Sequence, residues 1–158
     1  MGYITYLKGD ATLPSTKGNK IIVHICNDIG KWGKGFVLSL SKRWELPEKE
    51  YRRSYSSFNK PILGEVQFVK VERDILVANI IGQRGIRYSR DPQSPSPIRY
   101  DAVEEGLLVV TDKVLKHNAS VHMPRIGCGL AGGDWGTIEG IINKTLINKG
   151  IKVYVYDL

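Results

Sequence analysis

The stretch KIIVHICNDIGKWGKGF, from Lys20 to Phe36, decides the fold class of this chain. Its first part, KIIVHICN, is almost entirely apolar, which is typical of a strand buried on both faces of a sheet. A loop with three glycines in nine residues follows. Phe36, Leu40 and Trp44 then recur at the spacing of one helix face. A buried strand that leads through a glycine loop into a helix is typical of an α/β protein.

A second glycine-rich stretch, RIGCGLAGGDW, runs from Arg125 to Trp135 and has four glycines in eleven residues. We expect it to follow another strand and to precede another helix, so both loops fall at carboxyl ends of strands. Open α/β sheets bind ligands at this edge, where glycine lets backbone N–H groups point at an anion. The two glycine-rich loops together predict a site that holds a diphosphate from two sides. Neither loop matches the dinucleotide or nucleoside-triphosphate fingerprints, and two ordinary tight turns are the alternative.

The rest of the chain alternates between strand and helix patterns. Strands are expected over residues 3–8, 20–27, 65–71, 75–81, 119–127 and 151–158. Helices are expected over residues 36–44 and 47–58, from an N-cap at Asp101 onward, and over 134–150. The third and fourth strands form a hairpin-like pair. These patterns predict one domain, residues 1–158, with a three-layer α/β/α fold and a mixed, roughly six-stranded sheet.

Composition limits the classes of partner and cofactor. The 158 residues carry a net charge of +7, from 23 basic and 16 acidic residues, which favours anionic partners. The basic residues are spread along the chain, so we expect no sequence-specific nucleic-acid binding. Cys26 and Cys128 suggest reduced thiols and a cytoplasmic protein, and the three histidines lack metal-ligand spacing. We therefore expect no metal, no cofactor and no membrane span.

Six segments together carry a family resemblance. They are KGDAT (8–12), VHICNDIGKWGKGF (23–36), IIGQRGI (80–86), PIRYDAV (97–103), MPRIGCGLAGGDW (123–135) and the closing VYVYDL. Their combination resembles a macrodomain over nearly the whole chain. It is most similar to the branch of ADP-ribose-1″-phosphate phosphatases, and next to the branch of terminal ADP-ribose protein glycohydrolases.

The resemblance implies a set of ligand-binding residues. Asp10, beside Ala11, matches the acid that accepts from the adenine amino group, although a turn carboxylate is the plainer role. The loop that wraps the distal ribose and one phosphate corresponds to Asn27, Gly33, Lys34, Gly35 and Phe36. The diphosphate loop corresponds to Gly127, Cys128, Gly129, Leu130 and Ala131. Tyr156 matches a strand that borders the adenine pocket, with core packing as its alternative.

Two residues are candidates for catalysis. Asp134 is expected either to cap the following helix or to activate water, and the two roles are compatible. His24 lies in an apolar strand, where a histidine is usually part of the core, but the phosphatase branch also has histidine at this position. At an ordinary pKa it would donate a proton to a leaving oxygen.

Other reactive side chains fit the resemblance less well. Cys128 is not expected to be a phosphatase nucleophile, because the residue five positions later is Gly133 rather than arginine. Gln83 stands where the glycohydrolase branch carries its nucleophilic lysine, and Ala131 stands where that branch carries its acid. A lysyl-adduct mechanism is therefore not expected. Basic and polar residues of the nearby loop either screen a phosphorylated ligand or are merely solvated; they are Arg87, Arg90, Arg99 and Tyr100.

The expected ligand is ADP-ribose or ADP-ribose-1″-phosphate, and the expected reaction is metal-free hydrolysis of the latter to ADP-ribose and phosphate. Water attack assisted by Asp134, with His24 in a proton-transfer or orienting role, is the hypothesis for its mechanism. Three alternatives stay open: an ADP-ribosyl hydrolase that acts on modified protein or nucleic acid, a non-catalytic ADP-ribose reader, and a basic nucleic-acid protein.

Overall fold

The structure is a computed structural model that describes residues 2–86 and 95–158. The strands of these residues are β1 (Thr5–Lys8), β2 (Lys20–Asn27), β3 (Val66–Glu72), β4 (Ile75–Gln83), β5 (Ser120–Met123) and β6 (Val153–Asp157). The helices are α1 (Phe36–Arg43), α2 (Leu46–Tyr55), α3 (Tyr100–His117) and α4 (Trp135–Thr145). Two short 3₁₀ turns accompany them, η1 (Gly129–Ala131) and η2 (Ile147–Lys149).

All six strands of the described residues form one mixed sheet in the order β1-β6-β5-β2-β4-β3. The first five strands in this order pair in parallel, and β3 pairs antiparallel with β4 across a turn at Arg73 and Asp74. The parallel strands therefore place their carboxyl ends at one edge, where the loops after β2, β4 and β5 leave the sheet. This confirms the predicted mixed sheet and its hairpin.

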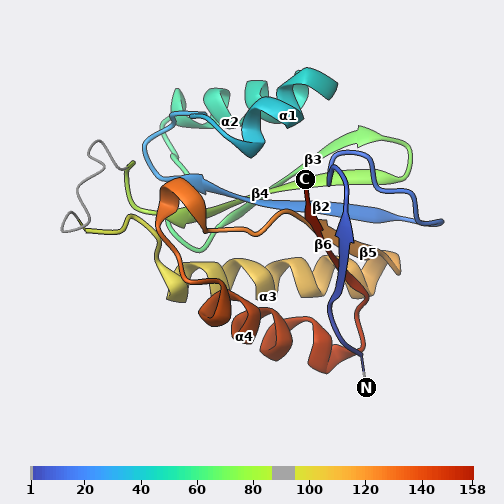
Figure 1. Cartoon of the computed structure of the whole chain (residues 1–158). Coiled ribbons are helices and arrows are strands. Elements are labelled where there is room, and N and C mark those ends of the chain that lie inside the picture. Colours follow the sequence, from blue (N-terminus) through green and yellow to red (C-terminus); the bar gives the residue numbers. More distant parts are fainter. Residues whose placement is uncertain (1, 87–94) are drawn as a thin grey trace.

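Helices cover both faces of the sheet, so the fold has three layers (Figure 1). Strand β2 shows why both faces need cover, because every residue in it except Ile25 is buried. Ile21 and Val23 pack into the core under α3 and α4, whereas Ile22 and Cys26 pack into the core under α1 and α2. The predicted α/β/α layering is confirmed. None of the helices in the described part of the chain is long and apolar enough to cross a membrane.

Several element boundaries differ from the sequence prediction. The fifth strand ends at Met123 rather than at residue 127, since Pro124 has no N–H to donate to a strand ladder. Helix α3 begins at Tyr100 with Arg99 as its N-cap, so Asp101 lies in the first turn instead of capping it. The last helix also ends earlier, at Thr145, and the chain continues through η2 to Gly150 in the left-handed conformation.

Candidate functional site

A cavity of about 390 Å³ opens at the carboxyl edge of the parallel strands. Four parts of the chain supply its walls: the end of β2, the start of α1, the end of β4 and the loop after β5. Its lining residues are His24, Ile25, Lys34, Gly35, Phe36, Val37, Gln83, Pro124, Arg125, Ile126, Gly127, Cys128, Gly129, Leu130 and Ala131. Both predicted glycine loops therefore contribute to the same cavity.

The loop after β5 requires its glycines for two different physical reasons. Gly127, Gly129 and Gly132 have φ angles of 73°, 70° and 74°, which only glycine adopts without strain. Gly133 instead leaves room for the backbone, because a Cβ atom there would lie 2.3 Å from the carbonyl oxygen of Gly127. The N–H of Gly133 donates to that same oxygen at 2.8 Å. The loop thus folds back on itself and presents its backbone to the cavity.

The other wall of the cavity is the amino-terminal end of α1. Its N-cap is Gly35, with φ 88°, and the cap has no side-chain hydrogen bond. The first turn of α1 contains no acidic residue, so the partial positive charge of the helix end is not neutralised within the helix. Lys34 precedes the cap and also lines the cavity. This wall is suited to an anionic ligand.

Arg125 adds a second cation on the opposite wall. Its guanidinium makes two hydrogen bonds to the Asp157 carboxylate, at 2.8 and 3.0 Å, and lies 5.1 Å from the ring centroids of Tyr6 and of Trp135. The hydrogen bond to Asp157 raises the pKa of Arg125, which holds it charged. Among the described residues that line the cavity, the charged side chains other than histidine are Lys34 and Arg125, both basic. Because Asp157 neutralises Arg125, the positive charge of the cavity, among the described residues, comes from Lys34 and from the amino-terminal end of α1.

His24 lies at the floor of the cavity and is only 2% exposed. Its Nε2 lies 2.5 Å from Oδ1 of Asn79. The amide of Asn79 is oriented by its other contacts, because its Nδ2 donates to the backbone oxygen of Pro47 at 3.3 Å and to Oε1 of Gln67 at 3.0 Å. Gln67 is oriented in turn by its own donation to the backbone oxygen of Glu50 at 3.0 Å.

This series of contacts fixes the tautomer of His24. Backbone oxygens only accept, so Asn79 must present its oxygen to the ring, and Nε2 of His24 must carry the hydrogen. Burial lowers the pKa of His24 to about 4, partly offset by the Asn79 hydrogen bond. At neutral pH the ring is therefore uncharged, its Nε2–H is held by Asn79, and its Nδ1 can accept a proton but not donate one.

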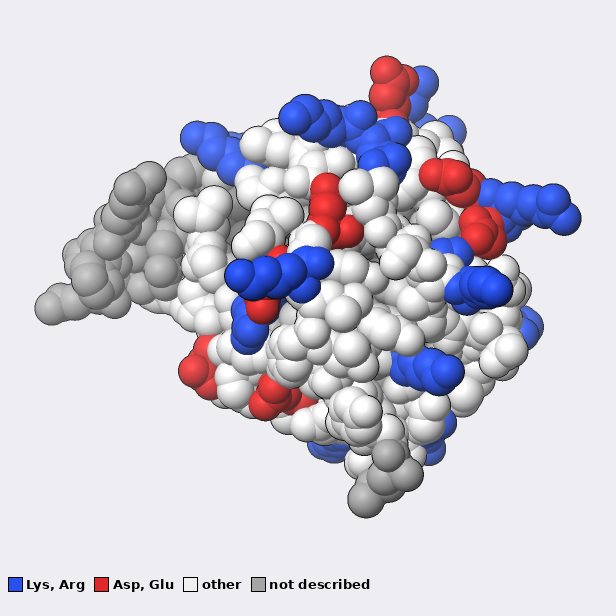
Figure 2. Space-filling view, turned by 45° about the vertical axis from the view of Figure 1, so that its right-hand side comes forward, with Lys and Arg blue, Asp and Glu red and all other residues white. Residues whose placement is uncertain are grey.

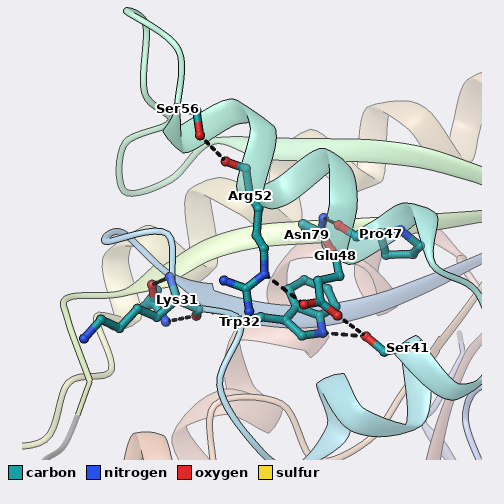
Figure 3. A network of polar contacts seen from close by, with 9 residues as sticks. Lys31, Trp32, Ser41, Pro47, Glu48, Arg52, Ser56 and Asn79 are labelled. Atoms are coloured by element: carbon teal, nitrogen blue, oxygen red, sulfur yellow. Dashed lines mark hydrogen bonds and ion pairs between the residues drawn. The ribbon is translucent and has the colours of Figure 1, made fainter.

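The glycine loop after β2 is held by side chains that do not line the cavity. Asn27 donates to the Lys31 carbonyl at 2.5 Å, and its Oδ1 accepts from Tyr51 at 2.7 Å. Trp32 donates from Nε1 to Ser41 at 2.8 Å. Ser41 then donates to Glu48, which also accepts from Arg52, as Figure 3 shows. The loop that carries Lys34 and Gly35 is thus tied to both α1 and α2.

Ten of the sixteen predicted site residues line the cavity. These are His24, Lys34, Gly35, Phe36, Gln83, Gly127, Cys128, Gly129, Leu130 and Ala131. The other six do not line it: Asp10, Ala11, Asn27, Gly33, Asp134 and Tyr156. Arg87 and Arg90 lie outside the described residues. Arg99 donates to the carbonyls of Ser96 and Ile98, and Tyr100 accepts from the N–H of Asp134.

Three of the predicted residues outside the cavity have structural roles. Asp134 is exposed and caps α4, because its Oδ2 accepts from the N–H and the hydroxyl of Thr137, each at 3.0 Å. Asp10 accepts from the N–H and hydroxyl of Thr12, each at 2.8 Å, as a turn carboxylate does. Tyr156 is buried, and its hydroxyl lies 2.7 Å from Nδ1 of His122, which is the core role given as its alternative.

Cys128 lines the cavity as a protonated thiol. Burial raises its pKa, and the charge of Asp134 raises it further. A raised pKa reduces the fraction of thiolate, which is the form of cysteine that acts as a nucleophile.

Sequence reasoning missed Arg125 and Asn79. Arg125 is the first residue of the glycine-rich stretch 125–135. Its position between the end of a predicted strand and Gly127 was the signal that could have placed it at the ligand site. Asn79 had no such signal, because it is 55 residues from His24 in sequence and meets it only through the parallel pairing of β2 with β4.

Comparison with known proteins identifies the family. No protein-family model matches the chain. A macrodomain protein from Streptomyces coelicolor has a solved structure that is 48% identical, with a TM-score of 0.86 over 98% of this chain and 99% of that one. The chain belongs to the macrodomain family.

Two curated relatives extend the comparison. The chromodomain-helicase-DNA-binding protein 1-like of Mus musculus is 34% identical over 97% of this chain, which spans only 17% of that relative's length. The ADP-ribose 1″-phosphate phosphatase of Lodderomyces elongisporus is 26% identical, over 98% of this chain and 99% of the relative. The chain is thus similar over nearly its whole length to an enzyme and to one segment of a much larger protein.

Proposed function

We propose that the cavity binds ADP-ribose derivatives and that the protein hydrolyses ADP-ribose-1″-phosphate to ADP-ribose and phosphate. The observation that carries the proposal is the electropositive cavity, walled by two glycine loops, the amino-terminal end of α1, Lys34 and Arg125. A ligand with a diphosphate and a further phosphate matches these donors. The full-length similarity to a phosphatase supports the choice of substrate.

In the proposed reaction, water attacks the distal phosphorus atom. A new P–O bond forms, the bond between phosphorus and the 1″-oxygen breaks, and the proton of the water passes to a base. The 1″-oxygen leaves with the electron pair and takes a proton from solvent. Lys34 and the loop N–H groups offset the charge that develops on the phosphate oxygens. Asp134 directly follows the glycine loop of the cavity without lining the cavity itself, and we retain it as the candidate base on that sequence position.

His24 is assigned an orienting role rather than that of a proton donor. A neutral ring with Nε2–H committed to Asn79 has no second proton to give at neutral pH. The ring lines the cavity, and Nδ1 is the ring atom left to accept a hydrogen bond from a ligand hydroxyl or from water.

The test is phosphorus NMR of ADP-ribose-1″-phosphate with near-stoichiometric protein. Loss of the monoester signal with growth of inorganic phosphate supports the phosphatase. Shifted diphosphate signals without new phosphate leave binding intact but contradict the phosphatase, and release of ADP-ribose from modified protein or nucleic acid then identifies the hydrolase alternative. Unchanged signals contradict binding itself.

Asp134→Asn is the informative variant, because asparagine also caps a helix but carries no charge. If Asp134 orients the water, turnover falls at least tenfold while α4 and the melting temperature are kept. Unchanged turnover removes Asp134 from the mechanism.

We also infer that residues 1–158 fold as one domain, since every described strand joins a single sheet. Two free cysteines, one of them buried, support a cytoplasmic location.

A further inference from the structure

Two adjoining hollows lie at the edge of the sheet opposite the ligand cavity. We name them the basic hollows. The first, of about 290 Å³, is bordered by the start of β2, the turn between β3 and β4, and the last turns of α3. The second, of about 300 Å³, is bordered by the end of α3 and by residues 149–152. Both hollows are lined by Asn19 and Ala119, which places them side by side.

Cations surround both hollows. Seven Lys and Arg residues line them, against one acidic residue, Asp74; they are Lys17, Lys20, Lys70, Arg73, Lys113, Lys149 and Lys152. Figure 2 brings forward the side of the molecule on which the β3–β4 turn lies, and Lys and Arg are spread over that side with fewer Asp and Glu. Seven cations against one carboxylate leave a surplus of positive charge around the hollows.

One cation of the set is already neutralised. Lys20 is buried, and its ammonium lies 2.7 Å from Asp74 and donates to the carbonyl of Gly18 at 2.7 Å. Within residues 2–86 and 95–158, the other six have no carboxylate at ion-pair distance. Six like charges around two hollows repel one another, and an anionic partner relieves that repulsion.

The hollows also offer apolar surface. Half-buried Phe68 and Leu76 line the first and exposed Leu115 lines the second, whereas Ile75, Val114 and Ile151 beside them are buried. The ammonium of Lys113 lies 5.0 Å from the ring centroid of Phe68, so the cation and the aromatic surface are adjacent. Each hollow thus combines an apolar part with a cationic rim.

We propose that the basic hollows bind single-stranded nucleic acid, with bases in the two hollows and phosphates against the Lys and Arg rim. A single strand offers an apolar base and a charged phosphate in regular alternation, as this surface requires. A duplex stacks its bases inside and cannot place them in hollows, and an acidic protein partner is the competitor that the test below separates from a single strand. This binding is not sequence-specific, and it does not depend on the function proposed for the ligand cavity.

The test is fluorescence anisotropy of a labelled oligothymidine of about twelve nucleotides, a length within the range that single-strand sites cover. Four to six phosphate contacts predict that affinity falls about 50- to 340-fold between 50 and 200 mM salt. The variant Lys70→Glu with Lys152→Glu changes one exposed cation in each hollow, and we expect it to weaken binding at least tenfold. The matched control is Lys42→Glu with Lys49→Glu, which makes the same change of net charge on α1 and α2, away from the hollows.

Four results would overturn the proposal. The first is no binding by the unchanged protein at low salt. The second is equal loss of binding in the control and hollow variants, which means that only net charge matters. The third is displacement of the oligonucleotide by ADP-ribose, which places it in the ligand cavity. The fourth is stronger binding of polyglutamate than of the oligonucleotide at equal charge, which identifies an acidic protein partner. Binding that resists ADP-ribose and is lost in the hollow variant alone supports it.

Discussion

At the scale of single residues, the chemistry of the cavity depends on which atom of His24 carries a hydrogen. That hydrogen is assigned by contacts outside the cavity, through Asn79 and Gln67 to the backbone oxygens of α2 residues. The ring is therefore held neutral and in one tautomer before any ligand binds. Preorganisation of this kind reduces the rearrangement needed when a ligand enters.

Asn79→Asp tests this assignment directly. A carboxylate facing Nε2 favours the charged ring, so the pKa of His24 rises from about 4. Nitrogen-15 NMR of the ring gives both the tautomer and the titration midpoint. Asn79→Ala is the control, because it removes the oxygen without adding charge. A wild-type His24 that titrates near pH 6.5, or that carries its hydrogen on Nδ1, contradicts the assignment.

At the scale of elements, the loop after β5 is shaped by close backbone approach. Gly133→Ala places a methyl group against the carbonyl of Gly127, and overpacking of this kind costs about 1–3 kcal/mol. We expect weaker ADP-ribose binding, measured by calorimetry, together with a lower melting temperature.

Gly140→Ala is the matched control for the loop substitution. Gly140 lies in α4, and a Cβ there meets no atom within 4 Å. Alanine in an exposed helix interior is favoured over glycine by about 0.5–1 kcal/mol, so this variant should be at least as stable as the original and should bind ADP-ribose equally. Equal binding by both variants would show that the backbone turn at Gly133 does not shape the site.

At the scale of the whole molecule, two histidines are buried in the sheet. Burial lowers the pKa of His24 and of His122 to about 4, below the value of 6.5 that an exposed histidine has. His122 is held by Tyr156 and Ser120, at 2.7 and 2.8 Å. Both rings are neutral in the folded state and protonate more readily in the unfolded chain.

The free energy of unfolding should therefore decrease in acid. Below pH 6.5 the unfolded state binds more protons than the folded state does. The stabilisation that comes from the two neutral rings is therefore fully present above pH 6.5 and is lost progressively towards about pH 4. Each histidine contributes up to about 1.4 kcal/mol per pH unit in this range. Urea unfolding at pH 7 and pH 5 measures the effect, and the exposed His117→Asn variant should retain it. A stability that is unchanged at pH 5 would contradict the burial of both rings.

The architecture could be predicted from the sequence because the apolar runs and the glycine-rich stretches of the chain agree with the fold that it adopts. The apolar run of β2 is buried on both faces, and the two glycine loops line one cavity. Boundaries were less accurate where one residue decides them, as Pro124 does at the end of β5. Asp134 had two compatible roles in the sequence, and the structure displays the capping one.

The sequence by itself determined the order of strands and helices, the positions of the glycine loops and the family resemblance, because these depend on periodicity and on residues that are close along the chain. Only the tertiary structure decided which side chains meet across the sheet. Asn79 reaches His24 across the parallel pair of β2 and β4, and Arg125 after β5 reaches Asp157 at the end of β6. The cations of the basic hollows gather where the β3–β4 turn, the end of α3 and residues 149–152 meet. Such contacts depend on strand register, and register is fixed by the packing of both cores rather than by any single segment.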